Sequence, residues 1–337
     1  TTATSWRWMP IMAWCVFWNA RDILHTMNRI LVSGSLAYDR IMDYPGLFKE
    51  HFHPEKVHVL SVSFLVDTLE ESRGGTAGNI AYNLALLGEQ PTLIASAGND
   101  FEKYRAQFTK IGIDTESVQI ESDVPTAVAH VITDTTDSQI SAFYLGAMAH
   151  EYAKDVPSTA DLAIVSPGNL TDMNELPKKY RERNIPFFYD PGQQMTTLSS
   201  DALREAMQGA VAIFGNDYEI NMMLRKLEWT KEELLQHVPV LVTTLGAEGS
   251  LISTPEKEYQ VAPVATEKAV DPTGAGDAYR AGFMKGWLTK LAPDTCAKLA
   301  GTIAVYAVEE YGTQKHTFTM DAFRARFETA YGEKCPI

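Results

Sequence analysis

Short apolar runs and stretches of helical periodicity alternate along this chain. The short runs, bounded by turn-forming residues, are typical of buried strands. They predict strands at 29–36, within 57–72, at 91–97, 126–133, 139–145, 161–166, 186–190, 211–214 and 239–244, and two more between 248 and 262. Apolar positions three and four residues apart predict helices at 79–87, 101–111, 171–183, 199–208 and 216–227, and in three segments from 275 onward.

Strands and helices alternate regularly after residue 160, which favours one particular architecture. We expect an α/β fold, with a doubly wound, mostly parallel sheet and helices on both of its faces. Two segments, about 40–72 and 126–146, interrupt the alternation and predict a small β-rich insertion. Open sheets of this kind bind ligands at the carboxyl ends of their strands, so the turns there are the expected place for chemistry.

The first 26 residues do not follow this pattern. The apolar run from Met9 to Trp18 contains Pro10 and is shorter than the ~20 residues that cross a bilayer. It also lacks the basic start and the cleavage site of a secretory signal. We therefore interpret residues 1–26 as an extension outside the fold, with a membrane-surface anchor as the alternative, and expect residues 27–337 to form one domain.

Composition and charge narrow the class of partner. The chain has 337 residues, of which 45% are hydrophobic and 21% are charged, an ordinary globular composition. Lys and Arg number 29 against 43 Asp and Glu, so the net charge is −14 at pH 7. Nucleic acid and anionic membranes attract basic proteins, and neither is favoured here as a partner. Three widely spaced cysteines argue against a disulfide scaffold and favour a reduced, cytoplasmic setting.

The strongest chemical signal is the segment Asp271-Pro-Thr-Gly-Ala-Gly-Asp277, directly before a predicted helix. Its small residues expose backbone N–H groups at the positive end of a helix dipole, an arrangement that binds phosphate. The Asp277 carboxylate would repel a bound anion, so its presence beside an anion site needs an explanation. Phosphoryl transfer supplies one, because that reaction needs a base next to the phosphate. The alternative is an ordinary helix start with an Asp that favours the dipole. The chain has no Gly-Lys-Ser/Thr phosphate loop, which excludes that class of kinase.

Four motifs together resemble those of the ribokinase-like, or PfkB, family of sugar and nucleoside kinases. The segment 271–283 is similar to the C-terminal signature of the family, and Gly74-Gly-Thr-Ala-Gly-Asn-Ile-Ala81 is similar to its N-terminal signature. Between them, Asn216-Asp-Tyr-Glu219 resembles the Asn-x-x-Glu motif, and Thr243-Thr-Leu-Gly-Ala-Glu-Gly249 resembles the nucleotide-binding turn. Their order and spacing agree over residues 28–331, nearly the whole chain.

This resemblance implies an ATP-dependent kinase in which Asp277 takes the proton of an acceptor hydroxyl. It assigns the anion hole to the backbone amides of three residues, Gly274, Ala275 and Gly276. It also implies that Glu219 holds Mg²⁺ through water and that Asp271 and Thr273 hold a monovalent cation such as K⁺. The residues that would contact ATP are Asn216, Thr244, Gly246 and Gly249.

On the acceptor side, the resemblance implies that Asp39, Gly75 and Asn79 bind substrate hydroxyls and that the β-rich insertion is a lid. Phe143 lies on this predicted lid, in a segment that, like Gly312-Thr-Gln314, is similar to bacterial nucleoside kinases. Its ring would stack on a purine, and packing of the lid against the domain is the alternative. We therefore expect an adenosine-like nucleoside as the acceptor. The alternatives are a sugar such as ribose or fructose, and a non-catalytic nucleotide sensor.

Positive charge near the predicted acceptor site is sparse. Only Arg73 and Arg280 are candidates for binding an acceptor phosphate, so a phosphorylated sugar is disfavoured. An exposed strand edge on the lid permits either a monomer or a lid-mediated homodimer.

Overall fold

The computed structural model describes residues 28–51, 61–136 and 138–337. The predicted extension at 1–26 lies outside the described residues, as do residues 57–60 of the predicted strand region. Among the helices that the structure does describe, none is long and apolar enough to cross a bilayer.

The centre of the protein is an eight-stranded sheet with the order β14-β13-β12-β11-β10-β9-β1-β4. The six strands from β12 to β4 in this order run parallel, and β13 and β14 are antiparallel to their neighbours. The prediction of a mostly parallel, doubly wound sheet is therefore confirmed. The strands are β1 (Ile30–Ser33), β4 (Pro91–Ile94), β9 (Leu162–Val165), β10 (Phe187–Tyr189), β11 (Ala212–Asn216), β12 (Leu241–Thr244), β13 (Ser250–Ser253) and β14 (Glu258–Val261).

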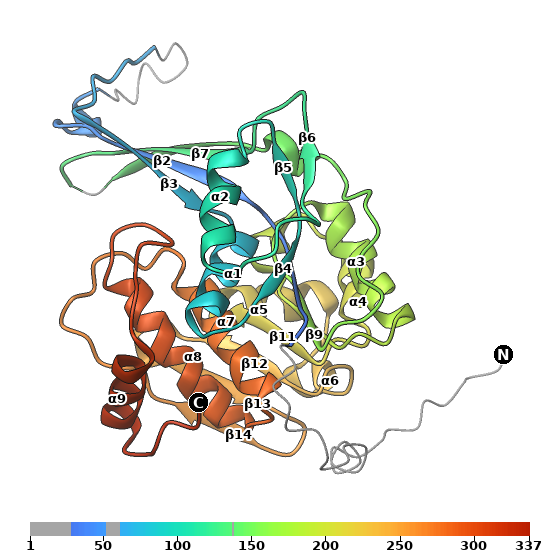
Figure 1. Cartoon of the computed structure of the whole chain (residues 1–337). Helices are drawn as coiled ribbons and strands as arrows, with labels where there is room; N and C mark the ends of the chain where they lie inside the picture. Colours follow the sequence, from blue (N-terminus) through green and yellow to red (C-terminus); the bar gives the residue numbers. More distant parts are fainter. Residues whose placement is uncertain (1–27, 52–60, 137) are drawn as a thin grey trace.

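Helices cover both faces of this sheet (Figure 1). Side chains alternate between the two faces of a strand, so Ile30 and Val32 belong to one buried cluster and Leu31 to another. The helices on the first side are α1 (Thr76–Leu86), α2 (Glu102–Lys110), α7 (Ala275–Leu288) and α8 (Pro293–Val308), with α9 (Met320–Tyr331) outside α8. The helices on the second side are α3 (Leu170–Glu182), α4 (Ser200–Met207), α5 (Asp217–Leu227) and α6 (Lys231–Leu234).

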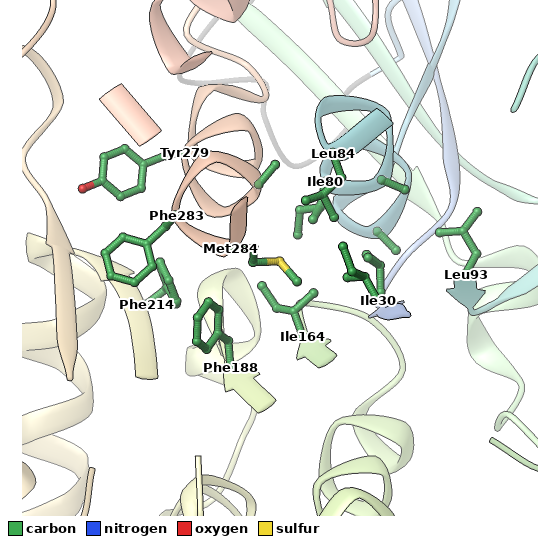
Figure 2. Close-up of a cluster of buried hydrophobic side chains, with 14 of the residues drawn as sticks. Ile30, Ile80, Leu84, Leu93, Ile164, Phe188, Phe214, Tyr279, Phe283 and Met284 are labelled. Carbon is green, nitrogen blue, oxygen red and sulfur yellow. The ribbon is translucent and has the colours of Figure 1, made fainter. Parts of the chain in front are cut away.

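A cluster of aromatic rings fixes α7 to the sheet (Figure 2). The Phe283 ring of α7 lies 5.3 Å from the Phe214 ring of β11 and 5.9 Å from the Phe188 ring of β10, measured between centroids. Both contacts are edge-to-face, a geometry that aromatic pairs prefer, and all three rings are fully buried. The start of α7, where the predicted phosphate site lies, is therefore held by the core below it.

A second sheet of four strands, in the order β3-β2-β7-β8, extends away from the helices (Figure 1). Its strands are β2 (Ala37–Asp43), β3 (Thr68–Gly74), β7 (Ala127–Thr133) and β8 (Gln139–Tyr144). We call these four strands the arm sheet. The insertion was predicted to begin at about residue 40, whereas the structure places Asp39 inside β2, opposite Ser72 and Ala129.

The structure also differs from the predicted elements at short segments. The single strand expected at 91–97 is two strands, because β5 (Ser96–Gly98) leaves the main sheet and pairs with β6 (Gln119–Glu121). Neither β6 nor α6 was predicted, since three or four residues show no periodicity. A capping box between Thr230 and Glu233 begins α6, and that local signal was the only one available.

Helices α7 and α8 approach closely because α7 carries a glycine at the contact. A Cβ atom on Gly282 would lie 2.6 Å from the Ala300 Cα, where no side chain is able to move aside. We predict that Gly282→Ala lowers the free energy of unfolding by about 1–3 kcal/mol, because the two helix backbones must separate. Urea denaturation measures the change.

Gly301→Ala in α8 is the matched control. Its Cβ would lie 2.8 Å from the Tyr331 hydroxyl, the far end of a side chain that can rotate, and 4.0 Å from Val264 Cγ2, an ordinary contact. The gain in helix propensity then offsets the contact, and we expect little or no loss of stability. Equal destabilisation by both substitutions would show that the close approach of α7 and α8 is not the constraint.

Candidate active site

Two residues far apart in the sequence meet at the start of α7. Asp277 lies in the first turn of this helix, and the Nδ2 of Asn79 donates a hydrogen bond to its Oδ2 at 2.8 Å. Asn79 lies in α1, which packs beside α7. The structure therefore brings together a residue predicted to bind the acceptor and the residue predicted to act as the base.

The backbone before Asp277 forms a tight helix start. Gly274 is the N-cap and has φ = 78°, a left-handed conformation that favours glycine. The N–H of Ala275 donates to the Pro272 carbonyl at 3.1 Å, so one of the three amides predicted for the anion hole is already used. No backbone carbonyl of the described residues accepts from the N–H of Gly274 or Gly276. These two amides are the ones left for an anion.

Burial governs the protonation of Asp277. The loss of solvent around the half-buried carboxyl raises its pKa to about 7. The hydrogen bond from Asn79 and the nearby positive charge of Arg280 oppose this increase, and the charges of Asp190 and Asp39 add to it. A carboxyl with a pKa near neutrality is suited to take up a proton and release it again.

Arg280 does not face the acceptor side. It was predicted as a second candidate for binding an acceptor phosphate, but only 6% of its surface is exposed. Its Nε donates to Oδ2 of the buried Asp190 at 2.5 Å, and its Nη1 donates to the Gly276 carbonyl at 2.9 Å. Arg280 lies one turn beyond Gly276 in α7, and its guanidinium carbon is 5.7 Å from the centre of the buried Phe214 ring. The ion pair is therefore in the core and does not line the cavity.

The arm sheet presents a mixed polar and aromatic face on the other side. Strand pairing puts Ser72, Asp39, Ala129 and Phe143 in one row, so these side chains project from the same face. Burial, together with the negative charge of Asp271, raises the pKa of Asp39 to about 6. Half of the Phe143 side chain is exposed.

The other basic candidate, Arg73, projects from the opposite face of the arm sheet. It pairs with Tyr38 in β2, whose ring packs on Tyr104 in the core. Neither arginine that the sequence offered for an acceptor phosphate is therefore placed to bind one. Asp39, Ile41 and Asp43 of β2 project from one face of the arm sheet, and the residues paired with them across the sheet include no basic side chain.

A cavity of about 740 Å³ separates this face from the loops at 270–273 and 311–313. The lining is rich in carboxylates, namely those of Asp39, Asp43, Asp67, Asp134 and Asp271. The lining includes Thr313, which packs against Gly274 at the start of α7. The volume is in the range of sites for small organic ligands.

The residues predicted for ATP lie at the carboxyl ends of β11 and β12. Asn216 and Thr244 are paired in the parallel register of these strands. Gly246 has φ = 57° and open space at its Cβ position. The fold itself requires glycine at position 249, since a Cβ there would lie 2.1 Å from the Val261 carbonyl oxygen.

Asn216 and Glu219 form a capping box at the start of α5. Asn216 Oδ1 accepts from the Glu219 N–H at 2.8 Å, and Glu219 Oε2 accepts from the Asn216 N–H at 2.8 Å. Asn216 is the N-cap of α5 and also the last residue of β11, so it precedes the helix in which Glu219 lies. Their spacing of three is explained by the cap alone. The second oxygen of Glu219 has no hydrogen bond within the described parts of the chain.

Asp271 ties the phosphate-site loop to the C-terminal segment. Its Oδ1 accepts from the Thr273 N–H and its Oδ2 from the Gly312 N–H, both at 2.9 Å. Burial raises the pKa of this carboxyl, but these hydrogen bonds outweigh it and the pKa is lowered. Asp271 is thus an ionised group that lines the cavity.

Gly75 is required by the backbone. It has φ = 85°, and a Cβ would lie 2.5 Å from the Ser35 carbonyl. Two residues to which the sequence analysis gave no role, Tyr104 and Gln314, are buried beside Asn79. The similarity around Gly312-Thr-Gln314 was the one signal that singled out part of this group.

Comparison with known proteins identifies the family. Residues 27–319 match the model of the pfkB family of carbohydrate kinases. The chain is 32% identical over 320 residues to a nucleoside kinase of Methanothermobacter thermautotrophicus, covering 91% of this chain and 98% of that protein. The chain therefore belongs to the pfkB family and is an ATP-dependent phosphotransferase with a hydroxyl acceptor, in the group of nucleoside and sugar kinases.

Solved structures agree with this assignment. A nucleoside kinase of Burkholderia thailandensis in complex with inosine is 34% identical, with a TM-score of 0.79 over 90% of this chain and 99% of that one. A nucleoside kinase of Methanocaldococcus jannaschii, an archaeal member of the ribokinase family, is 26% identical with a TM-score of 0.83, covering 90% of this chain and 99% of that one.

The raised pKa of Asp277 predicts a gain in stability when the carboxyl is removed. Burial in the folded state raises the pKa of Asp277 from 3.8, the ordinary value of an aspartate, to about 7, so the fold favours the protonated form. The resulting stability is complete below pH 4 and is lost as the pH rises through 7. We predict that Asp277→Asn raises the free energy of unfolding at pH 8 by on the order of 2 kcal/mol and leaves it unchanged near pH 4.

Urea denaturation at both pH values measures this difference. Asp201→Asn is the matched control, because Asp201 also lies in the first turn of a helix, α4, but is exposed. It should change stability little at either pH. A gain for Asp277→Asn that is the same at pH 4 and pH 8 would contradict the burial argument.

Proposed function

We propose that this member of the pfkB family transfers the γ-phosphate of ATP to the hydroxymethyl group of a nucleoside, with a purine nucleoside such as adenosine or inosine as the acceptor. The observation that carries the proposal is the Asp277 carboxyl, hydrogen-bonded to Asn79 at the start of α7. It stands beside unused backbone amides, and Gly274 at the start of the same helix packs against Thr313, which lines a ligand-sized cavity. A base next to an anion site is what phosphoryl transfer requires.

In the proposed reaction, Asp277 accepts the proton of the acceptor hydroxyl while its oxygen forms a bond to the γ-phosphorus. The bond between that phosphorus and the bridging oxygen breaks, and ADP leaves with the electron pair. The amides of Gly274 and Gly276 donate to the phosphoryl oxygens, where negative charge is concentrated. The amide of Ala275 contributes less than the sequence implied, because Pro272 already accepts from it.

Asn216, Thr244, Gly246 and Gly249 would bind ATP at the carboxyl ends of β11 and β12. The free oxygen of Glu219 fits a hydrated Mg²⁺, which would neutralise phosphate charge when bound. Asp271 fits a monovalent cation such as K⁺ through its ionised carboxylate, together with Thr273. In the structure the two carboxylate oxygens of Asp271 accept hydrogen bonds from the backbone N–H groups of Thr273 and Gly312, and these bonds hold the loop in place.

The acceptor would lie between the arm sheet and the loops of the main domain. Asp39, Asn79 and the backbone at Gly75 would bind vicinal hydroxyls of the ribose, and the arm sheet would act as a lid that excludes water. The cavity supports a neutral acceptor, because its ring of carboxylates repels a phosphorylated sugar. The relatives with nucleoside kinase activity, one of them in complex with inosine, support a nucleoside over a free sugar.

Asp277→Asn provides the direct test of the mechanism. We predict that it lowers kcat by at least about 1,000-fold with adenosine or inosine, since Asn takes up no proton. For the native protein, kcat/KM should rise with pH and level off above about 7, where Asp277 is ionised. ATP consumption measured over pH 5.5–9 gives both results.

Asp201→Asn, the exposed counterpart, should keep full activity in the same assay. Full activity of Asp277→Asn would contradict its role as the base. Binding of ATP and nucleosides with no turnover in the native protein would indicate a sensor instead.

Phe143 provides the test of the acceptor. If its ring stacks on the base, Phe143→Ala should raise the KM for inosine and adenosine by about 2- to 10-fold, because such contacts contribute about 0.5–1.5 kcal/mol. The KM for ribose, which has no base, should not change. Tyr144→Ala is the matched control, since Tyr144 is the next residue of β8, projects from the opposite face and is equally exposed.

A change caused equally by Phe143→Ala and Tyr144→Ala would mean that these rings only stabilise the arm sheet. Efficient turnover of ribose or fructose, with no activity on any nucleoside, would replace the nucleoside by a sugar.

A further inference from the structure

We propose that Gln314 is a positioning residue for Asp277 and acts by fixing the orientation of the Asn79 amide. This inference rests on the proposed role of Asp277 as the base. It concerns two buried polar side chains, those of Tyr104 and Gln314, which have no contact with the acceptor or ATP in the proposed function.

Tyr104, Gln314, Asn79 and Asp277 are linked by hydrogen bonds in which the donor and the acceptor of each bond are determined. The Tyr104 hydroxyl donates to the Gly74 carbonyl at 2.8 Å, and Nε2 of Gln314 lies 2.7 Å from the same hydroxyl. A hydroxyl has a single proton, which Gly74 already accepts, so the Tyr104 oxygen must accept from Gln314. The nitrogen of the Gln314 amide therefore faces Tyr104.

The same nitrogen determines how Asn79 is turned. Nε2 of Gln314 also donates to Oδ1 of Asn79, at 2.9 Å. With its oxygen held there, the Asn79 amide directs Nδ2 to the Asp277 carboxylate at 2.8 Å. If the Asn79 amide were reversed, its oxygen would face the carboxyl, and only a protonated carboxyl would form that bond. The relay thus favours the ionised form of the base.

The surrounding structure is arranged to hold this relay. Tyr104 is fully buried and Gln314 is 4% exposed. Gly78 of α1 makes room for both, since a Cβ there would lie 2.1 Å from the Tyr104 hydroxyl and 3.1 Å from Nε2 of Gln314. Gln314 has φ = 57°, a conformation that glycine adopts more easily. A side chain kept at a strained position indicates that the side chain is needed.

Replacement of Gln314 by an uncharged residue of similar length tests the proposal. Gln314→Met removes both donors, so Asn79 is free to reverse. We expect the rise of kcat/KM with pH to shift upward by about 0.5–1 pH unit, with a loss that is several-fold at pH 6.5 and small at pH 9. The charged groups near Asp277, which are Arg280, Asp190 and Asp39, are unchanged in this variant.

His316→Met is the matched control on the same segment. His316 is buried and bonds to Oδ1 of Asn83 at 2.8 Å, and Asn83 donates in turn to the backbone carbonyl of Asn79 at 2.9 Å. These hydrogen bonds reach the backbone of Asn79 and not the side-chain amide that faces Asp277. Its own pKa is lowered to about 4 by burial, so it is neutral over the range measured. We expect a loss of stability with no shift of the pH profile.

A Gln314→Met variant whose kcat/KM falls equally at every pH would overturn the proposal, because that is the result of a purely structural role. If this variant does not fold, Tyr104→Phe removes the anchor of the relay while keeping the ring, and it should shift the profile in the same direction. An active Asp277→Asn would refute the proposed function itself. An inactive Asp277→Asn with an unshifted Gln314→Met profile would refute the relay alone.

Discussion

The constraint on which this molecule depends is a carboxyl group held half-buried at the start of α7. Burial raises the pKa of Asp277, and a glycine turn before it exposes backbone amides. The burial of this carboxyl and the exposure of these amides both require that α7 be fixed in position. The edge-to-face contacts of Phe283 fix α7 against the sheet, and the close approach at Gly282 fixes it against α8. The core therefore matters to the chemistry because it sets where the helix begins.

The charge distribution follows from the same arrangement. A chain of net charge −14 belongs to a family of enzymes that use the polyanion ATP. The positive charge closest to the site, Arg280, is bound to Asp190 and the Gly276 carbonyl and is not presented to a ligand. Backbone amides and the helix dipole are what remain to attract phosphate. If phosphate binds at the start of α7 as proposed, the helix dipole would attract it there, while the carboxylates of the cavity would repel it elsewhere.

The sequence predicted the fold class and nearly every long element, because buried strands and amphipathic helices have clear periods. It predicted the site less completely, for reasons that particular residues show. The spacing of Asn216 and Glu219 fits a helix cap as well as a metal site, and the structure contains the cap. Arg280 could not be recognised as buried, because its partner Asp190 is 90 residues away. Tyr104 has no motif, and the similarity around Gln314 gave it no role, because hydrogen bonds between segments far apart in the sequence bring these two side chains and Asn79 together.

Gly74 joins the two halves of the site. Its Cα has no room for a side chain, because a Cβ would lie 2.2 Å from Oδ2 of Asp39. Its carbonyl accepts from Tyr104 and so begins the chain of hydrogen bonds that ends at Asp277. As the last residue of β3, it is also where the arm sheet meets α1. Gly74 thus lies against Asp39 and also accepts the hydrogen bond that anchors Tyr104. If Asp39 binds the acceptor and Asp277 is the base, as we propose, a movement of the arm sheet at Gly74 would affect both residues together.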